Sequence, residues 1–282
     1  MGDFSHLINF LNDQNEERLR NNFLKAKGYE DPLSKNFGLN QWTERLQIDA
    51  TDQKTSHLVS FLTIPSHLQD ELIDIRSEEL HKWISRYQWI RLPDVDSSFS
   101  NGELIACSDG LIWPSALTST NLQQMDKFLI IYHSGVCEYG LGKEAVYIYE
   151  EEVYFDLIRI IGRLWQFLLF SKEFYQNYVF DNIPHYLCYV NIRGTQNALL
   201  GGLANGWNQP FGDPFRAYKP RCADIHLQII KKVPVGISQE QIENIVRWFA
   251  TRIDNAWGQF EPRCYVNKNR DSTLVYSSFC KI

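Results

Sequence analysis

Two arginines lie in an otherwise apolar stretch of the sequence and could bind an anion. Arg159 and Arg163 recur with Asp156 and Gln166 at spacings of three and four residues, which forms one narrow polar stripe on an expected helix over residues 151–172. An arginine on such a helix must reach solvent, pair with a carboxylate or bind an anion, because an unpaired buried charge is costly. Pairing with Asp156 or other carboxylates and binding of an anionic ligand or partner are both open.

A second group of polar side chains follows a buried strand expected within Pro184–Trp207. The apolar, β-branched and aromatic run Tyr186–Ile192 predicts this strand, and a small-residue turn leads from it into a loop rich in Pro, Gly and aromatic residues, 205–221. Binding sites are commonly built on such loops, which a rigid sheet positions. The expected ligand- or partner-binding residues are Arg159, Arg163, Arg193, Asn197, Trp207 and Arg216.

Nucleophilic catalysis by a cysteine would need a thiol beside an imidazole. His185 and Cys188, three residues apart, would point to opposite faces of a strand, and Cys222 and His226 would lie about 13 Å apart along one face. A dyad would therefore require partners distant in sequence, such as Cys222 with His133. We expect structural thiols and surface histidines, and no catalytic residue is assigned.

Other motifs of catalysis or cofactor binding do not fit the chain. Gly140–Glu144 lacks the first glycine of a phosphate loop and carries Glu144 where a magnesium-binding Ser or Thr is needed. Gly201–Gly206 lacks the order of a dinucleotide fingerprint. The acids Glu150–Glu152 are expected at a helix N-terminus, where the helix dipole favours them. No C-x-x-C occurs, so a structural zinc site lacks its usual spacing. We expect no metal and no cofactor.

Charge and composition predict a cytoplasmic protein. The net charge of −6 argues against a general grip on a phosphate backbone, although Arg216, Lys219 and Arg221 could form a local basic patch. The six cysteines are scattered and no signal peptide is apparent, which indicates reduced core thiols. The longest apolar run, Leu157–Phe170, is interrupted by polar residues, so no membrane span is expected.

The elements before residue 127 are expected to be a helical start followed by a mixed region. Leu58–Ile64 predicts a strand, and Ser66 is a good N-cap for a helix that would extend to Tyr87. Two short strands around Ser108–Gly110 predict a hairpin, because Asp-Gly is a strong turn signal. The aromatic content of 14% is expected to serve the core first.

The elements after residue 127 alternate more regularly. Phe128–Tyr132, Val136–Tyr139 and Cys222–Lys231 predict strands, and a capping box of Ser238 and Gln241 starts a last helix. The predicted fold is α+β (mixed α/β), an antiparallel or mixed sheet packed with amphipathic helices, with a helical N-terminal part. We expect two regions, a helical or mixed region over 1–126 and a sheet-containing α/β domain over 127–282.

The order of elements over about residues 127–260 resembles the C-terminal region of bacterial AlbA_2 (Schlafen-like) ATP-binding or DNA-binding proteins. The resemblance rests on the strands F-L-I-I-Y-H-S-G-V-C-E-Y, the helix I-I-G-R-L-W-Q-F-L, the strand and turn Y-V-N-I-R-G-T-Q-N-A-L-L, and the helix ending R-I-D-N-A-W-G. It covers less than half of the chain and carries over no catalytic residue. It implies a free-standing sensor or interaction module, associated in that family with nucleic-acid proteins.

The function that we expect is binding or regulation without catalysis, in a prokaryotic cytoplasm. A protein partner or a small anionic ligand is the expected partner, and the sequence does not give the oligomeric state. One alternative is a hydrolase or nuclease with a dispersed Cys, His and acidic site. Another is single-stranded nucleic-acid binding through aromatic and arginine residues, which the net charge does not favour.

Overall fold

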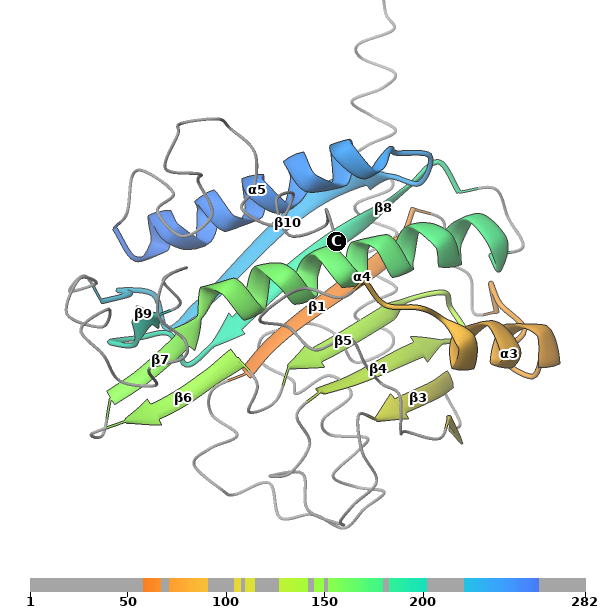
Figure 1. Ribbon diagram of the computed structural model, residues 1–282, viewed down its shortest axis with the longest axis horizontal. Helices are drawn as coiled ribbons and strands as arrows, with labels where there is room; N and C mark the ends of the chain where they lie inside the picture. Colours follow the sequence, from red (N-terminus) through yellow and green to blue (C-terminus); the bar gives the residue numbers. More distant parts are fainter. Residues whose placement is uncertain are drawn as a thin grey trace, which may run out of the picture.

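A large antiparallel sheet is the centre of the computed structural model (Figure 1). The structure describes residues 58–66, 71–90, 104–107, 110–114, 127–141, 145–149, 152–179, 183–201 and 221–258. The sheet has seven strands in the order β10-β8-β1-β5-β4-β3-β2. Its strands are β1 (Leu58–Pro65), β2 (Ile105–Cys107), β3 (Gly110–Pro114), β4 (Lys127–Tyr132), β5 (Cys137–Leu141), β8 (His185–Arg193) and β10 (His226–Pro234).

A smaller sheet and three helices complete the described fold. The small sheet has the order β6-β7-β9, with β6 (Val146–Tyr149) antiparallel and β9 (Leu199–Gly201) parallel to the central β7 (Glu152–Asp156). The described helices are α3 (Glu78–Arg86), α4 (Leu157–Asn177) and α5 (Gln239–Ala256). The expected α+β class is confirmed.

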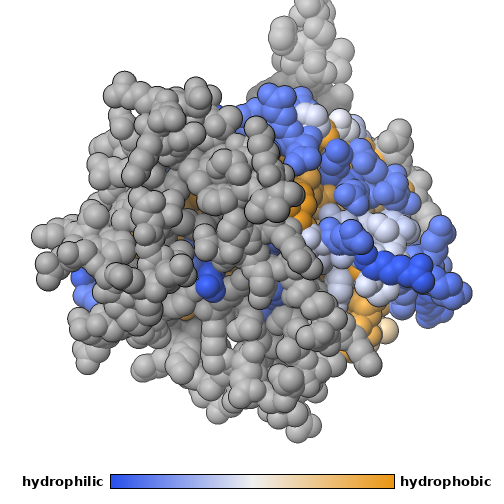
Figure 2. Space-filling view, in the orientation of Figure 1, coloured by the Kyte–Doolittle hydropathy of each residue, from blue (hydrophilic) through white to orange (hydrophobic). Residues whose placement is uncertain are grey.

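One face of the large sheet is covered by α4 and α5, which lie side by side across it (Figure 1). Figure 2 shows mainly hydrophilic side chains on the described part of this side of the molecule, with apolar side chains visible between them. Beneath α4, the ring of Phe167 stacks on Phe61 of β1, and the ring of Phe170 stacks on Trp89. These aromatic residues therefore serve the core, as expected. None of the described helices has the length and apolar character that crossing a bilayer requires.

The strand β1 lies in the middle of the sheet, because it pairs with β5 on one side and with β8 on the other. Phe61, for example, lies between Tyr139 of β5 and Val190 of β8. The hairpin of β2 and β3 joins the same sheet through β4, which confirms the expected hairpin. Strands from both sides of the expected division at residues 126 and 127 are thus hydrogen-bonded into one sheet.

The expected helix from Ser66 is wrong in its first part. The helix α3 begins only at Glu78, and the side chain of Ser77 accepts a hydrogen bond from the Leu80 N–H at 3.3 Å. Before it, the N–H groups of Leu72 and Ile73 both donate to the carbonyl of His133, at 2.8 and 3.2 Å. This segment is bonded to the turn between β4 and β5, and that tertiary contact replaces the helix.

The expected helix over 151–172 also begins later. Residues Glu152–Asp156 form β7, because Val153 and its aromatic neighbours pair with β6 and β9. The N-cap of α4 is Asp156, whose carboxylate accepts from the Arg159 N–H at 3.1 Å. Glu152 therefore does not lie at a helix N-terminus, and Glu150 and Glu151 lie outside the described residues.

The elements at the C-terminal end agree better with the sequence. The capping box of α5 is present, since Ser238 N–H donates to the Gln241 side chain at 2.8 Å and Gln241 N–H donates to Ser238 Oγ at 3.2 Å. The apolar side chains of one helix face are buried: Ile242, Ile245, Val246, Phe249 and Ile253. The strand expected at Cys222 begins instead at His226, so Cys222 and His226 do not share a strand face.

We predict that Gly140→Ala destabilises the fold by about 1–3 kcal/mol, the usual cost of overpacking a core. A methyl group at Gly140 would overlap the ring of Phe128, which is buried on the neighbouring strand β4. Urea unfolding measures the effect. The matched control is Gly236→Ala, where a methyl group meets nothing within 4 Å.

The double variant Gly140→Ala with Phe128→Leu tests the cause of this loss. If the clash with the ring is responsible, the smaller leucine restores part of the stability. Equal stability of Gly140→Ala and the wild type would contradict the prediction.

Candidate binding site at the end of β8

The strand β8 ends at Arg193 in a turn that carries the chain from the large sheet to the small one. Gly194 and Asn197 both have positive φ, at 68° and 61°. Glycine adopts this conformation without steric cost, and asparagine tolerates it better than most residues. The chain then enters β9, which pairs with β7 from Leu199 onward. The polar residues after the buried strand are thus held in a defined turn.

The segment before β10 holds this turn in place. The Thr195 N–H donates to the Ile225 carbonyl at 3.1 Å, and the Thr195 hydroxyl donates to the Asp224 carbonyl at 2.7 Å. The Asn197 N–H donates to the Cys222 carbonyl at 3.0 Å. The turn is therefore fixed by backbone groups from a segment some distance along the chain.

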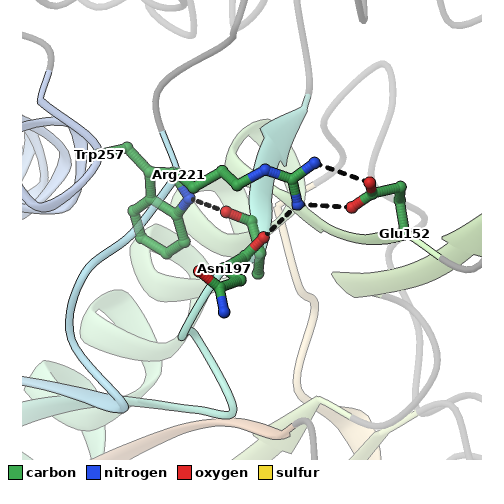
Figure 3. Close-up of polar contacts among 5 residues, drawn as sticks. Glu152, Asn197, Arg221 and Trp257 are labelled. Carbon is green, nitrogen blue, oxygen red and sulfur yellow. Dashed lines mark hydrogen bonds and ion pairs between the residues drawn. The ribbon is translucent and has the colours of Figure 1, made fainter.

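One arginine ties these pieces to the small sheet (Figure 3). Arg221 Nη1 and Nη2 donate to the two carboxylate oxygens of Glu152 in β7, at 2.6 and 2.7 Å. Arg221 Nη1 also donates to the Asn197 carbonyl at 2.7 Å. Trp257, at the end of α5, donates its indole N–H to the Ala198 carbonyl at 2.9 Å. We call these five residues the clamp.

The electrostatics of the clamp are those of a strong charge-assisted pair. The hydrogen bonds from Arg221 lower the pKa of the Glu152 carboxyl, and the same contact raises the pKa of Arg221. Bidentate pairing of guanidinium and carboxylate fixes orientation as well as charge. Both side chains remain partly exposed, so the ion pair lies at the surface, whereas Trp257 of the clamp is buried.

The clamp fixes both ends of the segment 202–220 on one strand. Gly201, the residue before this segment, pairs with Asp156 of β7, and Arg221, the residue after it, binds Glu152 of the same strand. Trp207 and Arg216 belong to the segment and lie outside the described residues. The two residues that flank the segment, Gly201 and Arg221, are therefore both attached to β7.

The clamp was not found by sequence reasoning. Glu152 was expected to favour a helix N-terminus, and Arg221 was considered only as part of a basic patch. Glu152 and Arg221 are 69 positions apart, so no local spacing reveals their contact. The one signal in the sequence is that Arg221 is the last residue of the long Pro- and Gly-rich segment 205–221.

The two arginines of α4 have different surroundings. Arg159 Nε lies 3.2 Å from Asp156 Oδ2, and the Arg159 side chain is 31% exposed. The expected pairing with Asp156 is therefore confirmed. Arg163 is only 1% exposed, and its Nη1 donates to Gln166 Oε1 at 2.9 Å. Gln166 in turn donates to the Ile90 carbonyl at 2.5 Å, so Arg163 lies in the core and does not reach the surface.

Arg193 lies at the same end of the molecule but on another side of the sheet. Ile192 packs in the core under the helices, and successive side chains of a strand alternate between faces. Arg193 therefore points away from α4. The three arginines that could have converged, Arg159, Arg163 and Arg193, are not brought together on one surface.

The thiols of the described cysteines are buried and weakly nucleophilic. Cys137, Cys188 and Cys222 are all free and buried, and burial raises the pKa of each thiol. A protonated thiol is a poor nucleophile. Among the described ranges, no group of three or more His, Cys, Asp and Glu side chains could hold a metal ion.

The example of a distant dyad, Cys222 with His133, does not form. His133 is in the turn beside the Pro65 end of β1, whereas Cys222 contacts the turn after β8, at the Leu58 end. An eight-residue strand separates the two ends by roughly 25 Å. His226 instead lies against the turn, where Gly194 N–H approaches His226 Nδ1 at 3.5 Å.

Comparison of the chain with protein-family models, curated proteins and solved structures found no match. The resemblance to AlbA_2 proteins therefore stays a prediction.

One buried carboxylate lies in the large sheet. Glu138, the second residue of β5, is fully buried and accepts a hydrogen bond from the Tyr132 hydroxyl at 2.9 Å. Its other oxygen, Oε1, has no hydrogen-bond partner among the described residues. Burial raises the pKa of Glu138 to about 8, against the opposing effect of the Tyr132 hydrogen bond. The residue is therefore largely protonated at neutral pH.

We predict that Glu138→Gln flattens the dependence of stability on pH. The native pKa of about 8 exceeds the ordinary value of 4.5, so the folded state binds a proton more tightly than the unfolded state. The wild type therefore loses stability as pH rises from about 4.5 to about 8, by on the order of 5 kcal/mol for the full shift. Glutamine has no proton to lose and still accepts from Tyr132.

Urea unfolding at pH 5 and at pH 9 measures this difference. Relative to the wild type, Glu138→Gln should gain stability at pH 9 compared with pH 5. Glu79→Gln, which changes an exposed carboxylate on α3, is the control. Parallel pH profiles of Glu138→Gln and the wild type would contradict the prediction.

We predict that Arg221→Gln opens the clamp without unfolding the sheet. The Asn197 N–H and the Cys222 N–H, which bond to the Cys222 and Ala198 carbonyls, should lose protection from hydrogen exchange. Amides of β1 should keep their protection. The pKa of Glu152 is lowered, so its contribution is lost as pH falls through that lowered pKa, and the clamp should also open in acid.

The exchanged pair Glu152→Arg with Arg221→Glu provides the second test. It should restore protection only in part, since a glutamate at position 221 cannot donate to the Asn197 carbonyl. Arg86→Gln, on the exposed surface of α3, is the control. Unchanged protection at Asn197 in Arg221→Gln would show that the ion pair does not hold the turn.

Proposed function

We propose that this protein is a non-enzymatic binding or regulatory protein whose recognition element is the segment 202–220, presented by the clamp. The observation that carries the proposal is that both ends of this segment are fixed on β7, by the β9 pairing and by the Arg221–Glu152 pair. A loop closed at its base by a rigid scaffold loses less conformational entropy on binding than one with free ends. This arrangement suits recognition.

The sequence of the segment suits a protein partner or a small anionic ligand. It contains Trp207 and Arg216, and both residue types are enriched among the side chains that dominate binding energy. Arg193 is the last residue of β8, Asn197 lies in the turn that follows, and Arg159 is in the first turn of α4. An arginine among aromatic and glycine-rich residues can bind a carboxylate or phosphate bidentately.

The described side chains favour binding over catalysis. The three described thiols are protonated, and Glu138, the carboxylate with the raised pKa, is enclosed within the sheet. The proposal includes a cytoplasmic location, because free thiols fit a reducing compartment. A regulatory role would use the clamp to transmit occupancy of the segment to β7 and α4.

Native mass spectrometry of the purified protein tests the proposal. We expect a co-purifying protein or small anion with the wild type, and at least about a tenfold loss of occupancy in Trp207→Ala and in Arg216→Ala, as for an interface hot spot. Arg86→Ala, remote on α3, should retain full occupancy. Retention in both loop variants would overturn the proposed site.

The same measurement separates the alternatives. Bound nucleic acid, released in proportion to salt, would replace the proposal by single-stranded nucleic-acid binding. A co-purifying molecule that the protein converts chemically would replace it by an enzyme. Wild-type protein without any bound molecule, from several expression hosts, would count against a recognition role.

A further inference from the structure

The strand β10 forms one edge of the large sheet, and within the described ranges only β8 pairs with it. The Val235 N–H donates to the Pro184 carbonyl at 3.1 Å, in register with the β10–β8 ladder. In an antiparallel pair, residues alternate between bonding to the neighbour and facing away from it. His226, Gln228 and Ile230 therefore direct their backbone N–H and C=O groups away from β8.

The position of Pro234 agrees with this alternation of backbone groups. Pro234 falls in the same alternating series, so it lacks an N–H where the ladder with β8 does not need one. The strand β10 is nine residues long, which is long for an edge. An edge of this kind is a ready template for one more strand.

An apolar side chain and two cationic side chains lie along the β10 edge, on opposite faces of the sheet. On the face away from the helices, Ile230 is 44% exposed, one of the two exposed large apolar side chains among the described residues. On the side of α5, Lys231 Nζ lies 4.2 Å from the centre of the Trp248 ring, and the Arg252 guanidinium lies 5.3 Å from the same centre. Two cations are thus held on one indole beside the edge.

We propose that the β10 edge binds an extended acidic peptide segment of a partner protein, added to the sheet as a further strand. The backbone groups of β10 would supply main-chain hydrogen bonds, as in other cases of strand addition. Side chains of the added strand would alternate between the two faces. Those on the α5 side would meet Lys231 and Arg252, which suits acids, and those on the other side would meet Ile230, which suits apolar residues.

Charge selects this occupant over a second copy of the chain. The chain as a whole carries a net charge of −6, so the cations beside β10 are a local exception. Two copies of the edge would bring lysines together, and like charges on neighbouring strands are destabilising. Lysine on an edge strand also discourages self-association. An acidic segment would instead be attracted by the positive charges of Lys231 and Arg252. This inference does not depend on the segment 202–220.

Hydrogen exchange followed by NMR tests the proposal with a synthetic peptide of alternating glutamate and valine. The N–H groups of Gln228 and Ile230 should gain about tenfold or more protection when the peptide binds. Those of Leu227 and Ile229, already bonded to β8, should change little. A peptide of alternating lysine and valine should not bind, and added salt should weaken the acidic peptide.

Two kinds of variant separate the backbone contact from the charge. Lys231→Glu with Arg252→Glu should lower peptide affinity at least about tenfold, while Arg86→Glu on α3 should not. N-methylation of the peptide residues that face β10 should abolish binding, and N-methylation of the alternate residues should not. The methylated peptides leave the protein unchanged, so this outcome does not depend on the folding of a variant.

Three results would overturn the proposal. The first is no added protection at Gln228 and Ile230 with saturating acidic peptide. The second is equal binding of the lysine peptide. The third is protection of these amides that rises with protein concentration alone, because it would make a second copy the occupant. These results concern the amides of β10 and the added peptide, whereas the proposed recognition by the segment 202–220 is tested separately by Trp207→Ala and Arg216→Ala.

Discussion

The pairing of β1 with both β5 and β8 is the interaction on which the rest of the described structure depends. It places a strand from early in the chain between two strands that come much later. The helix α4 then locks this arrangement from one face. The Tyr175 hydroxyl lies 3.0 Å from the Thr63 carbonyl of β1 and 2.9 Å from the Gly135 carbonyl in the turn before β5. Because β1 aligns β8, it also decides where β8 ends and where the clamp forms.

Burial gives two carboxylates of this fold opposite roles. Glu152 is partly exposed and paired with a guanidinium, so its ionised form is stabilised and contributes to holding a surface turn. Glu138 is enclosed beside Tyr132, and burial stabilises its neutral form. Acid therefore weakens the attachment of the small sheet, whereas alkali weakens the large sheet itself. The fold is expected to be most secure between these limits.

The sequence predicted the features that depend on neighbouring residues. The strand Tyr186–Ile192 is apolar and aromatic except for Asn191, and the capping box of Ser238 and Gln241 acts over three positions, so both follow from the sequence. The helix expected from Ser66 failed because the carbonyl of His133 accepts from two N–H groups of that segment. No pattern within the segment itself contains that contact.

The candidate site was predicted only in part for the same reason. Gly194 and Asn197 could be expected in a turn from their residue types, and their positive φ angles fit that expectation. The ion-pair partner of Arg221 could not be predicted, because the sequence around Glu152 is typical of acids at a helix N-terminus. Arg163 looked like a binding residue because its stripe is polar, but Gln166 of the same stripe accepts its hydrogen bond inside the core. A polar stripe on a helix does not distinguish a surface from an internal network.

The two surfaces singled out here use the two sides of β8 in different ways. The ladder hydrogen bonds of β8 stop at its end. The turn from Gly194 to Ala198 is held there by an ion pair, an indole and the segment before β10. Along its length, β8 pairs with β10 in a regular antiparallel ladder. The recognition proposed at the clamp would therefore depend on side chains that can be replaced one at a time. The recognition proposed at the β10 edge would depend on the backbone, and only its preference for acidic partners would depend on Lys231 and Arg252.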